Sequence, residues 1–201
     1  MGEDFMNIIL SLRGTSGSGK TTVARKFLTD YPTVTLPDPN GKKHWGYEVD
    51  LSSEGLAKKL YVIGSYANTC GGTDGISTQE EIADRALAAH PKGHVLLEGL
   101  LISKVGPNAI TTQMLKPTGA YVAAYLDTPL DLCLERVLAR RKERGDDRPF
   151  NPQNTISAHK STFAACKNLH AMGGVKVLTV DYMNAFNETL DIFKRGENDI
   201  L

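Results

Sequence analysis

The sequence has little cysteine, no long apolar segment and no excess of either charge. Its three cysteines, Cys70, Cys133 and Cys166, follow no metal-ligand spacing, which predicts a reduced cytosolic protein. Nothing in it resembles a bilayer-spanning segment or a signal peptide, so we expect a cytoplasmic location and no membrane partner. Lys plus Arg and Asp plus Glu balance at 23 each, which argues against tight nucleic-acid binding through global charge but allows a local basic surface.

Internal repeats, low-complexity stretches and dividing linkers are absent as well. A chain of 201 residues can bury enough apolar surface to fold without metals or disulfides. We therefore expect one α/β domain over residues 1–201. The sequence carries no signature of an oligomeric state.

Residues 14–21 carry the strongest signal, the spacing G-x-x-x-x-G-K-[ST] of a phosphate-binding loop. An apolar run at residues 7–12 predicts a buried strand before the loop, and residues 22–28 have a helical pattern after it. Backbone N–H groups of such a loop point at a polyphosphate, and the following helix adds its positive dipole end. The predicted phosphate-binding residues are Gly14, Thr15, Ser16, Gly17, Ser18, Gly19, Lys20, Thr21 and Thr22.

Two residues of this loop and one acidic residue on another predicted strand have distinct expected roles. Lys20 is expected to reach the β- and γ-phosphates, and the Thr21 hydroxyl to occupy one position on Mg²⁺. Residues 94–98 form an apolar run that ends in the acid Glu98, followed by Gly99. Because parallel strands end at the ligand side of an α/β sheet, we expect Glu98 to hold a Mg²⁺-bound water.

A long helix is predicted from Leu130, and arginines recur along it. Arg136, Arg140 and Arg144 have i, i+4 spacing and project to one side. A solvated charged face is the ordinary interpretation of such spacing. Phosphoryl transfer needs cations over the moving phosphate, which favours a functional role for one or two of these arginines.

Two aspartates are candidates for orienting an acceptor hydroxyl. Asp38 follows the β-prone residues 33–36, which we expect to form the second strand of the sheet. Asp74 lies in a glycine-rich loop, residues 68–76. Aspartate is also common in turns for structural reasons alone, which would explain either residue. The sequence does not decide which of the two aspartates meets the acceptor.

The acceptor-binding surface is expected over residues 42–76, as an inserted β-hairpin and the glycine-rich loop. Its first strand interleaves lysines with aromatic residues, which suits phosphate contacts and base stacking. The alternative is a strand whose aromatic side chains pack inward. The candidate substrate residues are Lys42, Lys43, Trp45, Gly71, Gly72 and Asp74.

Together, the phosphate loop, Glu98 and residues 130–148 resemble the P-loop kinases of the nucleoside monophosphate kinase type. This resemblance implies a five-stranded parallel sheet flanked by helices and an arginine-bearing lid, here residues 136–150. The run Glu135-Arg136-Val137-Leu138-Ala139-Arg140-Arg141 is similar to the start of that lid, which implies that Arg136 and Arg140 contact phosphate.

Three shorter motifs resemble phage-encoded kinases that phosphorylate 5-hydroxymethyluracil within DNA. They are Gly64-Ser65-Tyr66, Cys70-Gly71-Gly72-Thr73-Asp74-Gly75-Ile76 and Leu97-Glu98-Gly99. The resemblance implies ATP and Mg²⁺, a hydroxymethylated pyrimidine in DNA as acceptor, and the host cell cytoplasm as location. A small-molecule kinase acting on a nucleoside, nucleotide or sugar acid, and a non-enzymatic nucleotide-dependent switch, remain alternatives.

Overall fold

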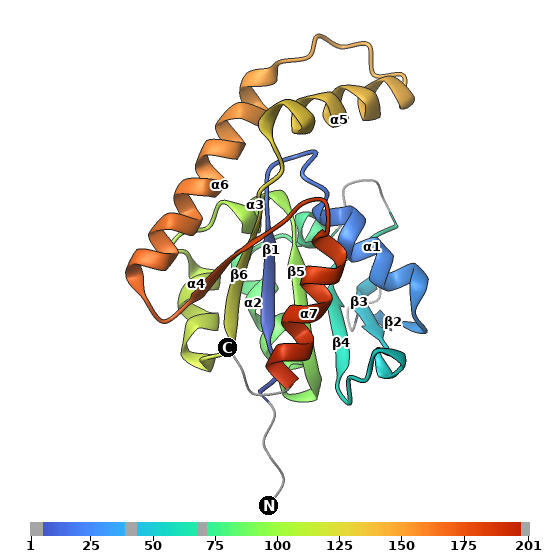
Figure 1. Ribbon diagram of the computed structural model, residues 1–201, viewed down its shortest axis with the longest axis vertical. Coiled ribbons are helices and arrows are strands. Elements are labelled where there is room, and N and C mark those ends of the chain that lie inside the picture. Colours follow the sequence, from blue (N-terminus) through green and yellow to red (C-terminus); the bar gives the residue numbers. More distant parts are fainter. Residues whose placement is uncertain (1–5, 39–43, 68–71, 198–201) are drawn as a thin grey trace, which may run out of the picture.

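The computed structural model describes residues 6–38, 44–67 and 72–197, which form one sheet flanked by helices (Figure 1). The strands are β1 (Ile9–Arg13), β2 (Thr33–Pro37), β3 (His44–Val49), β4 (Lys59–Ile63), β5 (Gly93–Glu98), β6 (Tyr121–Leu126) and β7 (Lys176–Val180). The helices are α1 (Lys20–Asp30), α2 (Gln79–Ala89), α3 (Leu100–Ser103), α4 (Ile110–Leu115), α5 (Leu130–Glu143), α6 (Pro152–Met172) and α7 (Ala185–Glu197). Short 3₁₀ turns cover Ser52–Glu54, Gly72–Gly75, His90–Lys92 and Lys116–Thr118.

The sheet has seven strands in the order β2-β3-β4-β5-β1-β6-β7, so the expected number of five is wrong. Strands β4, β5, β1, β6 and β7 pair in parallel, with β1 in the centre between β5 and β6. Strand β3 pairs antiparallel with both β2 and β4 and extends the sheet beyond the parallel part. The two additional strands are therefore β2 and β3.

The placement of residues 33–36 also differs from the expectation. They belong to β2, which is an edge strand and not the second strand of the parallel set. Its residues are exposed or half-buried, whereas every residue of β1 is buried. Central parallel strands are covered on both faces and read as continuous apolar runs, and the Thr-Val-Thr-Leu sequence does not.

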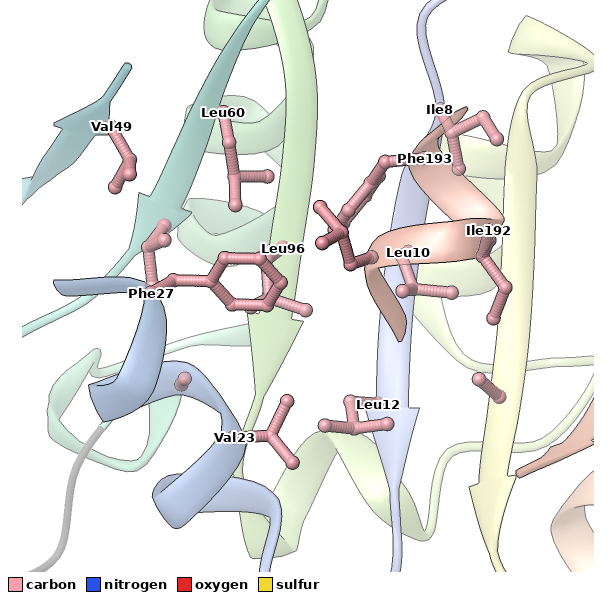
Figure 2. Close-up of a cluster of buried hydrophobic side chains, with 14 of the residues drawn as sticks. Ile8, Leu10, Leu12, Val23, Phe27, Val49, Leu60, Leu96, Ile192 and Phe193 are labelled. Atoms are coloured by element: carbon pink, nitrogen blue, oxygen red, sulfur yellow. The ribbon is translucent and has the colours of Figure 1, made fainter. Parts of the chain in front are cut away.

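Two apolar cores lie on the two faces of the sheet. Alternate residues of β1 divide between them, because successive side chains of a strand point to opposite faces. Figure 2 shows Leu10 and Leu12 of β1 packing with Phe27 of α1 and Phe193 of α7. Ile9 faces the other core, where α2 and the last turns of α6 pack.

The helices that follow the parallel strands begin near the carboxyl edge of the sheet. The Thr78 hydroxyl caps α2 by accepting from the Glu81 backbone N–H at 3.1 Å. Asn151 caps α6 in the same way through Gln153. Helix α5 lies beyond the carboxyl end of β1, and α6 returns along the sheet (Figure 1). No helix in the described part of the chain is long and apolar enough to cross a bilayer.

Phe27 is fully buried, and its ring lies 4.7 Å from the ring of Phe186 and 6.1 Å from that of Phe193, centroid to centroid. We expect Phe27→Ala to lower the free energy of unfolding by about 3–5 kcal/mol, because it leaves a cavity between α1, α7 and the sheet. Phe163→Ala is the matched control: Phe163 is 57% exposed, and its loss should cost less than about 1 kcal/mol. Urea denaturation measures both, and equal losses would contradict this description of the core.

Candidate active site

The phosphate loop connects β1 to α1 and lines a cavity of about 630 Å³. Gly17 has φ 82°, and a Cβ there would meet the Cys133 carbonyl oxygen at 2.3 Å, so the loop packs directly on the first turn of α5. Helix α1 begins at Lys20 without a side-chain cap, which leaves N–H groups of its first turn for a ligand. Residues 16–22 line the cavity, while Gly14 and Thr15 lie under Lys20.

Lys20 is buried within this loop, with 6% of its surface exposed. Its Nζ donates to the carbonyl oxygens of Gly14 at 2.8 Å and Thr15 at 3.0 Å. Burial lowers the pKa of Lys20, and the nearby carboxylates of Glu98 and Asp74 oppose that shift. The ammonium is therefore held in a poorly solvated position, where a phosphate would interact strongly with it.

Glu98 lies beside Thr21, as the sequence predicts, and is 1% exposed. The Thr21 hydroxyl donates to Glu98 Oε2 at 3.2 Å, while Oε1 has no hydrogen-bond partner among the described residues. Burial raises the pKa of Glu98, and the charge of Lys20 partly offsets the rise. Gly72 makes this burial possible, since a Cβ there would meet Glu98 Oε1 at 2.6 Å.

Thr21 and Glu98 are the oxygen donors available to a Mg²⁺ ion. Magnesium keeps several water ligands and is usually bound through one or two protein groups plus substrate phosphates. Among the described residues no group of three or more histidine, cysteine or acidic side chains could hold a metal alone. The donor set thus fits Mg²⁺ that arrives with a nucleotide.

Asp74 lines the same cavity and binds the start of α3. Its carboxylate accepts from the Leu100 N–H at 2.8 and 3.0 Å and from the Leu101 N–H at 3.2 Å. The side chain is exposed, so its oxygens can also accept from a ligand. These hydrogen bonds hold Asp74 at the mouth of the cavity.

Asp38 and Trp45 are placed away from the phosphate cavity. Asp38 lies 3.5 Å from Arg85 and follows β2, which is four strands from β1, or roughly 19 Å at the usual strand spacing. Trp45 packs inward against the second core and lines a separate cavity of about 270 Å³ with Tyr61 and Lys92. Inward packing was the alternative interpretation of this strand. Lys42, Lys43 and Gly71 lie outside the described residues.

Arg136 and Arg140 both reach the cavity from α5. Arg136 Nη1 donates to the Gly17 carbonyl oxygen at 3.3 Å. The Thr128 hydroxyl, just before α5, donates to the Ser18 carbonyl oxygen at 2.8 Å. Helix α5 is thus joined to the phosphate loop at two places, which brings two arginines to it.

The sequence did not identify the wall of the cavity that follows β7. Lys26 of α1 and Tyr182, Met183 and Phe186 line this wall, and Met183 is 77% exposed. A tyrosine and a methionine directly after a parallel strand were the available signal, because ligands bind at the carboxyl ends of such strands.

Comparison with known proteins finds relatives that cover nearly the whole chain, although no family model matches. A 5-hmdU DNA kinase of Pseudomonas phage PaMx11 is 37% identical over 186 residues, 89% of this chain and 93% of the relative. A 5-hmdU DNA kinase of Pseudomonas phage M6 is 28% identical over 192 residues, 89% of this chain and 94% of the relative. A third, from Delftia phage PhiW-14, is 20% identical over 171 residues, 78% of this chain and 62% of the relative.

The buried Glu98 gives a prediction for stability. Because the folded state raises the pKa of Glu98, ionisation above the usual carboxyl pKa destabilises the fold. We expect Glu98→Gln to increase the free energy of unfolding of the ligand-free protein at about pH 8, and the gain to shrink towards about pH 3, where both states are protonated. Urea denaturation across this range measures it.

Glu135→Gln is the control for this measurement, since Glu135 is exposed on α5. It should change stability by less than about 0.5 kcal/mol at any pH. A Glu98→Gln protein that is less stable than the wild type at every pH would contradict the prediction.

Proposed function

The chain belongs to the family of phage 5-hmdU DNA kinases, and from this premise we propose that it transfers the γ-phosphoryl group of ATP to the hydroxymethyl group of 5-hydroxymethyluracil in DNA. One observation in the structure supports the proposal most directly. A single loop brings together the buried Lys20, the Thr21–Glu98 pair and two arginines of α5 around one cavity. Phosphoryl transfer depends on this kind of positioned charge.

The proposed roles follow from these positions. The backbone of residues 14–19 and the first turn of α1 bind the phosphates, and Lys20 stabilises the charge that develops on the γ-phosphoryl group. Arg136 and Arg140 contact the same group from α5. Thr21 and a water on Glu98 hold Mg²⁺, which neutralises phosphate charge when bound.

We further propose that the nucleoside of ATP lies against the wall formed by Tyr182, Met183 and Phe186. This wall follows β7 and adjoins α1, whereas Glu98 ends β5, and both line the same cavity. The triphosphate then extends along the loop towards Glu98, and an adenine ring gains contact with an exposed methionine and an aromatic ring.

Asp74 is the better placed of the two candidate aspartates, because it lines the cavity and Asp38 does not. In the proposed step, the acceptor hydroxyl oxygen forms a bond to the γ-phosphorus while the bond to the β,γ-bridging oxygen breaks. The hydroxyl proton passes to Asp74 or water, and ADP leaves. Lys42, Lys43, Gly71 and Gly72 remain predicted contacts for the DNA, whereas Trp45 packs inward against the second core.

At the level of the fold, we propose a P-loop kinase of the nucleoside monophosphate kinase type. The parallel part of the sheet, with β1 between β5 and β6 and a helix directly after the loop, supports this assignment. We treat residues 1–201 as a single kinase domain with residues 136–150 as its lid. Residues 42–76 are the proposed substrate-binding region, of which β4 also belongs to the parallel part of the sheet.

A comparison of acceptors tests the function. The protein is incubated with Mg²⁺ and γ-labelled ATP and one of three acceptors: DNA that contains 5-hydroxymethyluracil, the same DNA with thymine, or the free hydroxymethylated nucleoside and nucleotide. We expect label only in the hydroxymethylated DNA. Label only in the free molecules would make the chain a small-molecule kinase, and ATP hydrolysis without any labelled acceptor would favour a nucleotide-dependent switch.

Lys20→Ala tests the assignment of the phosphate loop. We expect transfer to fall by at least about a hundredfold, because a positioned cation at the transferring group is lost. Circular dichroism should remain that of the wild type. Lys167→Ala, at an exposed position on α6, is the control and should keep full activity. Retained transfer in the Lys20 variant would overturn both kinase proposals.

A further inference from the structure

A third cavity, of about 310 Å³, adjoins the phosphate cavity between α3 and α6. We call it the α3–α6 groove. Ser16 and Leu100 line both spaces, so the groove opens from the end of the phosphate cavity that also contains Asp74 and Glu98. Its other polar lining residues are Lys104 on one side and Asn154, Ser157 and Ser161 of α6 on the other.

The chemistry of this groove suits a neutral hydrogen-bonding ring with a phosphate beside it. No carboxylate is among its described lining residues, and Lys104 is the one charged group there. The Asn154 amide offers both donors and an acceptor. The Ser157 hydroxyl accepts from Gln153 Nε2 at 3.1 Å, which leaves its own proton for donation to a ligand.

Hydrogen bonds fix both walls of the groove to the phosphate loop. Ser103 Oγ of α3 accepts from the Gly14 N–H at 3.2 Å. Thr15 Oγ1 donates to the Thr155 carbonyl oxygen of α6, also at 3.2 Å. A ligand in the groove is therefore held at a defined position relative to the phosphates, as a reacting hydroxyl must be.

The groove also lies on the correct side of the loop for transfer. The wall proposed for the nucleoside of ATP follows β7 and adjoins α7, whereas the groove adjoins α3, which follows β5. The two lie over opposite faces of the sheet, because α7 packs with α1 in one core, whereas α3 and α6 pack in the other. In-line displacement needs the acceptor and the leaving group on opposite sides of the γ-phosphorus, and sites over opposite faces of the sheet are consistent with this requirement.

Resting on the proposed function, we infer that the α3–α6 groove binds the acceptor nucleotide. The 5-hydroxymethyluracil ring, extruded from the stack, lies against α6 with its carbonyl and N–H groups on Asn154 and Ser157. Its hydroxymethyl group points past Ser16 into the phosphate cavity, and Lys104 contacts an adjacent DNA phosphate. A volume of about 310 Å³ is in the size range of small-ligand pockets.

Two variants with matched controls test the inference. Asn154→Ala is compared with Asn168→Ala, and Lys104→Ala with Lys160→Ala; all four positions are exposed, and neither control residue lines the groove. Steady-state transfer to a hydroxymethyluracil oligonucleotide gives separate KM values for DNA and for ATP. We expect the first variant to raise the KM for DNA about tenfold with the KM for ATP unchanged.

Lys104→Ala should weaken binding of the same oligonucleotide, measured by fluorescence anisotropy, and reduce the slope of log K against log salt by about one. If the wild type labels this DNA but the groove variants behave like their controls, the inference is overturned and the proposed function stands. A rise in the KM for ATP would also overturn it, because the groove would then belong to the ATP site. If the wild type labels no DNA, the proposed function itself fails.

Discussion

The site depends on the burial of one ammonium group between two backbone carbonyls and a carboxylate. Lys20 and Glu98 are each almost fully removed from water, and burial shifts the pKa of each towards its neutral form. A bound polyphosphate would supply negative charge beside Lys20, and its Mg²⁺ would supply positive charge beside Glu98. Burial of both charged groups without a ligand costs free energy, as is common where a site is shaped for binding and not for stability.

The phosphate loop also connects the elements around it. Gly14 contacts α3, Thr15 contacts α6, Gly17 packs on α5, and Ser18 accepts from Thr128, two residues before α5. These contacts join segments that are more than eighty residues from the loop in sequence. A change in the loop on nucleotide binding would therefore be transmitted to both helices of the α3–α6 groove and to the arginines of α5.

The sequence predicted those parts of the site whose signal is local. The loop has a fixed spacing, Glu98 ends a continuous apolar run, and the arginines of α5 repeat at helical spacing. The predictions from sequence were wrong where they depended on the order of the strands in the sheet. Residues 33–36 are β-prone but alternate polar and apolar, the pattern of an exposed edge, and placing Asp38 near the ligand required them to be central. Trp45 was ambiguous for the same reason, because its face depends on register.

The α3–α6 groove had no sequence signal, since its residues come from three distant segments that meet only through the topology. Its composition explains how a chain with no net charge can act on a polyanion. Affinity for DNA that relied on many lysine–phosphate contacts would require a basic face, and binding would then be strong to any sequence. Within the groove, one lysine beside an asparagine and several hydroxyls provides little unspecific attraction, so recognition at this site depends on the ring that the groove accepts. An enzyme that must select one modified base among many unmodified ones gains specificity when few of its contacts are to phosphates and more are to the base.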